Sequence, residues 1–141
     1  MSNLIVGYKG NFAEVDDDGQ LKVAHGGSLS TVTVTLSTGA TGLSDAVDIG
    51  GMQLMGVMMS TAWTAANLTF QASNSSAGTF ADVYDDAGTE VTVTAAASRA
   101  IAIDFASLKL APWRYLKVRS GTTALPVAQV GAKTLTLIGK V

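Results

Sequence analysis

The sequence predicts an all-β protein: an antiparallel two-sheet β-sandwich, jelly-roll-like, preceded by an extended N-terminal arm. Three observations support this fold class. Polar and apolar residues alternate without a break over residues 31–36, which is the period of a half-buried strand. Similar short segments, separated by turn residues, recur along the rest of the chain. No part of the sequence carries a long helical repeat of apolar residues.

The length and composition are those of one domain with an unusually uncharged surface. The chain has 141 residues, of which 48% are hydrophobic and 14% are charged. Globular proteins carry roughly 25% charged residues. A surface rich in Ser, Thr, Ala and Gly suits a protein covered by neighbours in a permanent assembly. It also suits an ordinary sandwich with threonine-rich outer faces, and composition does not separate the two.

Charge and cysteine content argue against several classes of partner and site. The net charge is −2 and the basic residues are scattered, which argues against nucleic-acid binding. The absence of cysteine excludes disulfides and thiolate zinc sites. The first residues lack the basic and apolar regions of a signal peptide, and no run of about 18 apolar residues could cross a membrane. We therefore expect synthesis in the cytoplasm and no membrane partner.

Residues 1–27 differ in composition from residues 28–141, which we assign to the sandwich domain. The first segment is rich in glycine, contains the acidic run at 16–18, and has one expected strand at 21–24. It is too short to form a core of its own. We expect it to lie as an extended arm along a neighbouring subunit or its own sandwich. The apolar anchors predicted for this arm are Leu4, Ile5, Val6, Tyr8 and Phe12.

The domain reads as eight to ten short strands with turn signals between them. The expected strands cover residues 28–37, 46–49, 52–60, 68–73, 80–84, 90–94, 100–104, 113–119 and 133–138. Short helical turns are expected at 62–66 and 105–110, and Pro112 ends the second of these. This spacing is typical of a sandwich or jelly roll.

Residues 52–60 form the most apolar strand and hold every methionine except the first. A nearly continuous apolar run predicts a strand covered on both faces. It is then either a central core strand or a strand whose second face is a subunit interface, since methionine also suits adaptable contact surfaces. In the second case Met55 and Met59 are the interface candidates.

The last dense group of charges lies in residues 113–119. Leu116 and Val118 share one face of this expected strand, and Tyr115, Lys117 and Arg119 share the other. The second face is either a solvated sheet surface or a contact for an acidic neighbour.

Catalytic and metal chemistry has weak support in the sequence. His25 is the only histidine and lies in a glycine-rich segment, without the serine and carboxylate arrangement of a triad. The acidic run at 16–18 lacks the distant glutamate of a calcium loop. Asp82, Asp85 and Asp86 read as a hairpin turn more readily than as an ion site. We expect a protein that is not an enzyme and has no metal or cofactor.

The aromatic residues leave two interpretations open. Trp63 and Trp113, with Tyr84 and Tyr115, could cap the sandwich core or form a platform on which a sugar stacks.

Three passages together resemble a known group of proteins. They are LSDAVDIGG at 43–51 before the apolar strand, AWTAANLTFQAS at 62–73, and PWRYLKVRSGT at 112–122 with PVAQ at 126–129. They resemble small β-sandwich proteins encoded among the structural genes of tailed bacteriophages and prophages. FAEVDDDGQLKV at 12–23 is similar to the V-D-x-D-G-x-L-K-V opening of phage head and tail accessory proteins.

The resemblance implies a virion structural role and transfers no catalytic residue. The expected function is that of a capsid decoration, or cement, protein on the outer surface of the head. Its partners would be the major capsid protein and further copies of itself, and a trimer would fit three-fold capsid positions. The alternative is a carbohydrate-binding receptor-recognition module of a head fibre, spike or tail accessory protein.

Overall fold

The computed structural model describes residues 3–6, 12–15, 21–22, 28–104 and 109–141, and all regular structure in them is β. The strands are β1 (Asn3–Val6), β2 (Phe12–Val15), β3 (Leu21–Lys22), β4 (Leu29–Leu36), β5 (Val47–Asp48), β6 (Gln53–Met58), β7 (Leu68–Ser73), β8 (Ala81–Asp82), β9 (Ala100–Ala102), β10 (Tyr115–Ser120) and β11 (Lys133–Lys140). Among the described residues no helix has the length and apolarity needed to cross a membrane.

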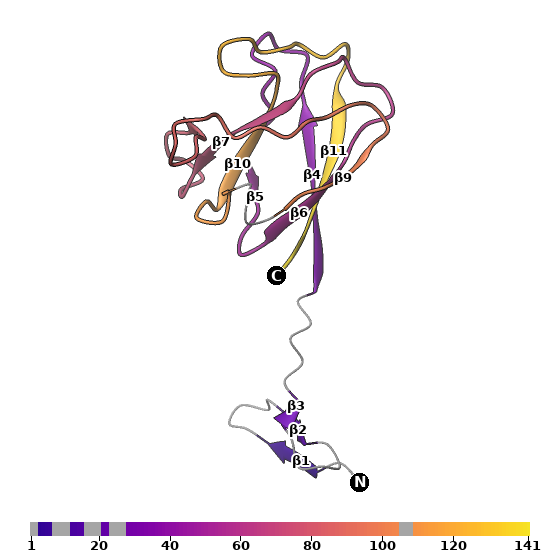
Figure 1. The fold of residues 1–141 in the computed structure, drawn as a ribbon, viewed down its shortest axis with the longest axis vertical. Helices are drawn as coiled ribbons and strands as arrows, with labels where there is room; N and C mark the ends of the chain where they lie inside the picture. Colours follow the sequence, from indigo (N-terminus) through magenta and orange to yellow (C-terminus); the bar gives the residue numbers. More distant parts are fainter. Residues whose placement is uncertain (1–2, 7–11, 16–20, 23–27, 105–108) are drawn as a thin grey trace.

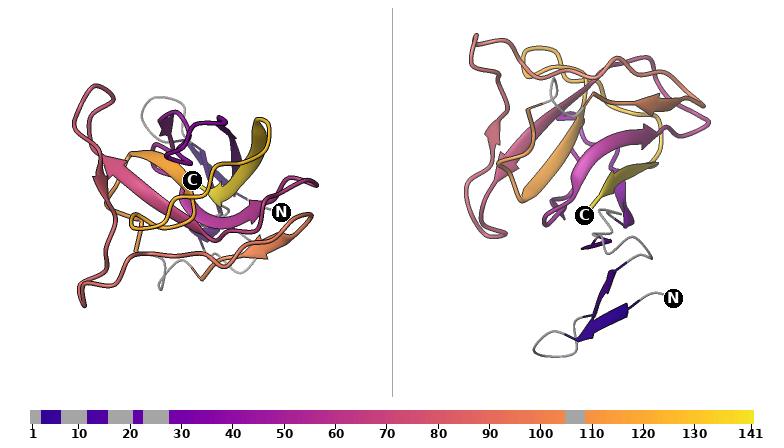
Figure 2. Two further views of the ribbon diagram at one scale, coloured as in Figure 1. Left: turned by 90° about the horizontal axis from the view of Figure 1, so that it is seen from above. Right: turned by 60° about the horizontal axis from the view of Figure 1, so that its bottom comes forward.

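Strands β4 to β11 form two sheets of four strands each. One sheet has the order β4-β11-β6-β9 and the other β5-β10-β7-β8 (Figure 1). All described pairings are antiparallel. Figure 2 shows β6 and β11 in one layer, and β7 and β10 in the other. The expected all-β class with two antiparallel sheets is confirmed.

The two sheets share one apolar core, because alternate side chains of each sheet point toward the other. The largest fully buried apolar side chains come from both sheets: Val34, Leu36, Val57, Leu135 and Leu137 from one, and Leu68, Phe70, Leu116 and Val118 from the other. The alternation in residues 31–36 therefore has the predicted effect. Val34 and Leu36 are buried, whereas Thr31, Thr33 and Thr35 are exposed.

A β-bulge lets β6 and β11 approach closely. The register between these strands shifts between Ile138 and Gly139. A Cβ atom at Gly139 would collide with the carbonyl oxygen of Gln53 and the side chain of Met52. Only glycine fits this position, because the buried strands leave no room for a side chain.

The first three strands form a separate antiparallel sheet, in the order β1-β2-β3. Among the described strands these three contact only one another. The sequence predicted a single short strand here, at residues 21–24, and β3 covers its first two residues. The extended arm itself stays a prediction.

The expected helical turn at 62–66 is wrong, because these residues form bends and irregular backbone. In that segment the indole Nε1 of Trp63 donates to the carbonyl oxygen of Ala66, 3.0 Å away, and closes a local loop. The second expected turn, at 105–110, lies largely outside the described residues, which resume at Lys109.

Candidate functional site

The outer face of the β4-β11-β6-β9 sheet carries almost no charge, and we call it the neutral face. Its residues, assigned from strand register, are Leu29, Thr31, Thr33, Thr35, Gln53, Met55, Gly56, Met58, Ala100, Ala102, Thr134, Thr136, Ile138 and Lys140. Among these described residues Lys140, at the end of β11, is the only one with a charged side chain.

Large apolar side chains are exposed on this face. Leu29 is 73% exposed, Met58 46% and Met55 40%. Gly56 leaves a shallow depression of about 260 Å³ between β6 and β9, bordered by Met55, Met58 and Ile138. Clustered exposed apolar residues without charge mark contact surfaces in soluble proteins more often than isolated ones do.

The two methionines predicted as interface candidates have different positions. Met55 lies on the neutral face, where the bulge between β6 and β11 turns it outward. Met59 is 4% exposed and belongs to the core, with its amide donating to the carbonyl oxygen of Arg99 at 2.9 Å. The interface prediction for Met59 is therefore wrong within this chain. Met58, which the sequence did not single out, is the exposed neighbour.

The outer face of the β5-β10-β7-β8 sheet is organised around a buried arginine, and we call it the charged face. The side chain of Arg119 is 6% exposed. Its Nη2 lies 2.5 Å from Oδ1 of Asp82, and its Nη1 lies 3.3 Å from Oε1 of Glu90. Nη1 also donates to the Thr123 hydroxyl at 2.7 Å. One guanidinium thus joins β10, β8 and two loops.

Both carboxylates in this cluster have further hydrogen bonds. Glu90 Oε1 accepts from the backbone amide of Thr123 at 2.9 Å and from its hydroxyl at 2.6 Å. Asp82 Oδ1 accepts from Nε2 of Gln71 at 3.1 Å. Burial raises the pKa of the Asp82 carboxyl, but the hydrogen bonds from Arg119 and Gln71 lower it by more, so its pKa lies below the ordinary 3.8.

Exposed charges at the margin of the charged face are also paired within the chain. Arg114 binds Asp48 through two hydrogen bonds of 3.2 and 3.1 Å, and these lower the pKa of the Asp48 carboxyl. The ammonium of Lys117 lies 4.7 Å from the centre of the Phe80 ring, a cation–π contact. The charged side chains of this face therefore make contacts within the chain.

The sequence placed Tyr115, Lys117 and Arg119 on one face of their strand. Their register with Ser73, Gln71 and Thr69 of β7 agrees with that placement. The side chain of Arg119 is nevertheless not an exposed cation. Asp82 and Glu90 cover it and pair with its charge, so the prediction that it contacts an acidic neighbour is wrong for this residue. Tyr115 and Lys117 are half-buried, and their contact with a partner stays a prediction.

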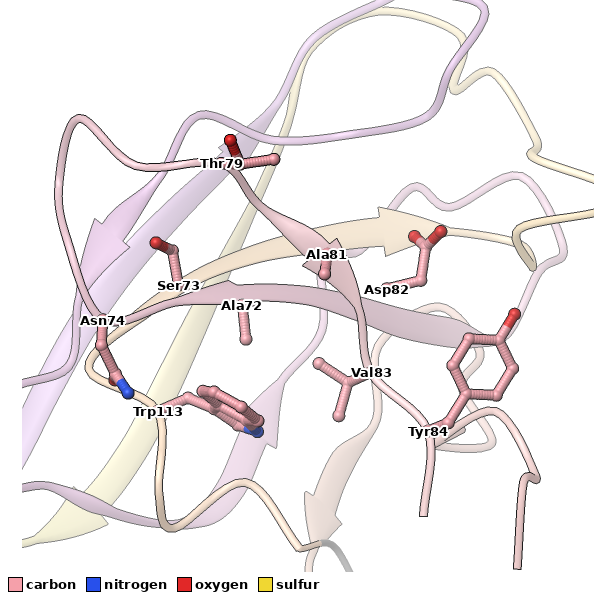
Figure 3. Close-up of a pocket in the computed structure, with 9 residues that line it drawn as sticks. All are labelled: Ala72, Ser73, Asn74, Thr79, Ala81, Asp82, Val83, Tyr84 and Trp113. Carbon is pink, nitrogen blue, oxygen red and sulfur yellow. The ribbon is translucent and has the colours of Figure 1, made fainter. Parts of the chain in front are cut away.

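A pocket of about 510 Å³ opens beside β7 and β8 (Figure 3). Trp113 lies next to Ala72 and Val83, with Asn74 at one end of the pocket and Tyr84 at the other. Tyr84 is 50% exposed, and Trp113 is half-buried against the core. Trp63 does not line this pocket.

The aspartates considered as ion ligands have other roles. Oδ1 of Asp85 accepts from the backbone amides of Ala87 and Thr89, at 2.9 and 2.8 Å, which builds a turn. Asp86 pairs with Lys109 at 2.6 Å. In the part of the chain that the structure describes, no group of three or more His, Asp or Glu residues is placed to hold a metal ion. His25 and residues 16–18 lie outside it.

The predicted arm anchors fall on the N-terminal sheet or outside the described residues. Leu4, Ile5 and Val6 lie in β1, and Phe12 begins β2. Tyr8 lies outside the described residues. The role of these five residues stays a prediction.

No family model, curated protein or solved structure matches the chain.

Proposed function

We propose that this chain is a non-catalytic structural protein of a tailed-phage virion, a capsid decoration or cement protein that binds the outer surface of the head. The neutral face is the observation that carries the proposal. Binding through an uncharged sheet face requires little desolvation of charge, so burying Met55 and Met58 gives a net gain. The phage assignment itself comes from the sequence resemblance.

The strand order supports a jelly roll as the finer description of the fold. Counted from β4, the two sheets have the orders 1-8-3-6 and 2-7-4-5. This is how an eight-stranded jelly roll wraps its two Greek keys. Jelly rolls recur in virion proteins, but they also serve lectins and enzymes, so the fold alone does not choose a function.

In the proposed mechanism, many copies bridge adjacent capsomers and add buried apolar surface to the shell. That surface would resist the outward pressure of the packaged DNA. The N-terminal segment would extend the reach of each copy to a neighbour. The major capsid protein, together with other copies of this chain, would be the partner.

The test compares two substitutions of exposed apolar residues by lysine. Met58→Lys places a charge in the middle of the neutral face, and Val130→Lys places one in a loop away from it. Val130 is 78% exposed and Met58 is 46% exposed, so neither substitution buries a charge in the core and both variants should fold. Each purified variant is added to heads of the parent phage that lack this protein, and bound protein is measured after sedimentation of the heads.

We expect wild type and Val130→Lys to bind the heads and Met58→Lys to lose at least tenfold in affinity, since the lysine must be desolvated at the contact. Equal binding by both variants would contradict the role of the neutral face. Wild-type protein that binds purified tails and not heads would contradict the decoration role itself.

A second candidate function rests on the pocket in Figure 3. Its lining combines two aromatic side chains, Trp113 and Tyr84, with the polar side chains of Asn74 and Thr79. A sugar ring offers apolar faces to aromatic rings and hydroxyls to amides and carboxylates. A carbohydrate-binding module would use this pocket.

Tyr84→Ala tests this second function, with Tyr115→Ala, outside the pocket, as its control. Wild-type protein is first screened against a panel of immobilised bacterial glycans. Binding that Tyr84→Ala weakens and Tyr115→Ala preserves would support the second function. No binding to any glycan of the panel would contradict it.

A further inference from the structure

The four edges of the two main sheets differ in length. The edge strands β5 and β8 have two residues each and β9 has three, whereas β4 has eight. Short edge strands protect a sheet against pairing with other chains, and long uncharged ones invite it. Residues 29–36 contain no charged residue, proline or glycine. Of the four edges of the two main sheets, β4 is thus the one that lacks these protections.

The backbone of β4 presents half of its hydrogen-bonding groups to the open side. The amide of Val141 donates to the carbonyl oxygen of Ser28 at 3.1 Å, so this pair faces inward to β11. Hydrogen-bonded pairs alternate along an antiparallel ladder. Ser30, Val32 and Val34 therefore also bond to β11, and the odd-numbered residues of β4 direct their N–H and C=O groups outward.

These outward groups are unused over most of the strand. Within residues 28–104 and 109–141, the backbone groups of Thr31 and Thr33 make no hydrogen bond on the open side. The edge closes only at Leu36, which forms a bridge with Ser44. Val32 points toward the core yet is only half-buried, as expected beside an open edge.

We propose that β4 pairs in antiparallel orientation with β4 of a second copy, which joins the two β4-β11-β6-β9 sheets into one continuous sheet about a two-fold axis. Such an interface is isologous: the same strand of both copies forms it, so a residue of β4 pairs with the same residue, or with one close to it in sequence, in the second copy. This requires a strand that does not repel itself, and β4 has no charge. The inference does not depend on the virion role.

The alternation of β4 makes it complementary to itself. Registers that keep valines on the core side place Thr33 opposite Thr33, or Val32 opposite Val32, of the second copy. In either register the threonines extend the neutral face without interruption. Because β4 has no charged residue, it offers no ion pair to a charged partner strand. Charge therefore does not favour another partner over a second copy.

The experiment places like or opposite charges across the proposed pair. Thr31→Lys/Thr33→Lys and Thr31→Glu/Thr33→Glu are made as separate proteins, and both positions are solvent-exposed. The control is Thr134→Lys/Thr136→Lys, on the same face but on β11, away from the edge. Sedimentation equilibrium gives the mass of each protein, and urea unfolding verifies that each is folded.

We expect wild type and the β11 control to dimerise, and each β4 variant alone to weaken dimerisation at least tenfold. A 1:1 mixture of the lysine and glutamate variants should restore it, because unlike charges then face each other. A wild-type monomer at every concentration would overturn the proposal. So would loss of dimerisation in the β11 control, which would indicate association through the face, or retention of dimers in both β4 variants.

Amide exchange adds a readout specific to backbone pairing. On dimerisation the amides of Thr31 and Thr33 should become protected, whereas those of Val32 and Val34 are already bonded to β11 in the monomer. Unchanged exchange at Thr31 and Thr33 in a verified dimer would also overturn the proposal.

Discussion

The two outer sheet faces of this molecule handle charge in opposite ways. On the charged face, Arg119, Asp82 and Glu90 form a cluster that is nearly buried within the chain itself. On the neutral face, threonines, methionines and alanines cover four strands with a single lysine at one end. The charges of the first face are paired within the chain, whereas the second face has almost no charges to pair.

The difference indicates which face is available to a partner. A partner that covered the charged face would have to compete with internal ion pairs or desolvate them. A partner on the neutral face displaces water mainly from apolar and hydroxyl groups, with Gln53 and Lys140 at one end as the other polar side chains. The charges of the charged face are therefore used within the fold, and we propose the neutral face as the contact surface.

The largest expected effect comes from breaking the charged cluster. Arg119→Met removes the cation and leaves Asp82 and Glu90 without their shared partner. Removing one member of a buried pair costs ~3–5 kcal/mol of unfolding free energy. Urea unfolding measures the change. The triple variant Arg119→Met, Asp82→Asn, Glu90→Gln should recover part of the loss, and equal stability of wild type and Arg119→Met would contradict the assigned role.

The second largest effect is expected from acid, which should lower the free energy of unfolding through the Asp82 carboxyl. The folded protein holds the pKa of Asp82 below its ordinary value of 3.8, so the folded state favours the ionised carboxylate. This contribution is fully present above pH 3.8 and is lost as pH falls through the lower, folded pKa. Unfolding measured from pH 6 downward should show a loss of stability below about pH 4 that is smaller in Asp82→Asn. An identical pH dependence in both proteins would argue against this linkage.

The exposed ion pair at the margin should matter much less. Asp48→Asn removes the negative charge and one of the two oxygens that accept from Arg114, but both side chains are about half exposed. Water and salt screen such pairs, so we expect a small loss in thermal midpoint that disappears at high salt. A loss as large as that of Arg119→Met would remove the distinction between buried and marginal charges.

The smallest effect on stability is expected on the neutral face. Met58→Ala truncates a side chain that is 46% exposed, and the unfolding free energy should change by less than about 0.5 kcal/mol. Binding to heads should nevertheless weaken. A marked loss of stability would mean that Met58 belongs to the core of this chain and not to a contact surface.

Local pattern predicted most strands of the two main sheets and their inner faces. It missed β1 and β2, and the strand expected at residues 90–94 forms only isolated bridges at Glu90 and Val93. The alternation in residues 31–36 placed Val34 and Leu36 in the core, and the spacing of Leu116 and Val118 placed Arg119 on the opposite face. These properties depend only on the two-residue period of a strand.

The state of each outer face depends on contacts between distant segments, which pattern does not contain. Arg119 is buried because Asp82 and Glu90 approach it from 37 and 29 positions away in the sequence. Met55 is exposed and Met59 buried because of a bulge opposite β11. The pocket likewise joins Tyr84 and Trp113, whose adjacency no spacing rule predicts.

Oxidative footprinting tests the central claim, that the neutral face is the contact surface, most directly. Met55 and Met58 carry exposed thioether groups on the neutral face. Tyr84 is an exposed aromatic residue beside the charged face. Hydroxyl radicals oxidise exposed methionine readily, and mass spectrometry locates the products. We predict that binding to heads protects Met55 and Met58 and leaves Tyr84 unchanged. Undiminished oxidation of both methionines in the bound protein, with protection of Tyr84, would contradict the claim.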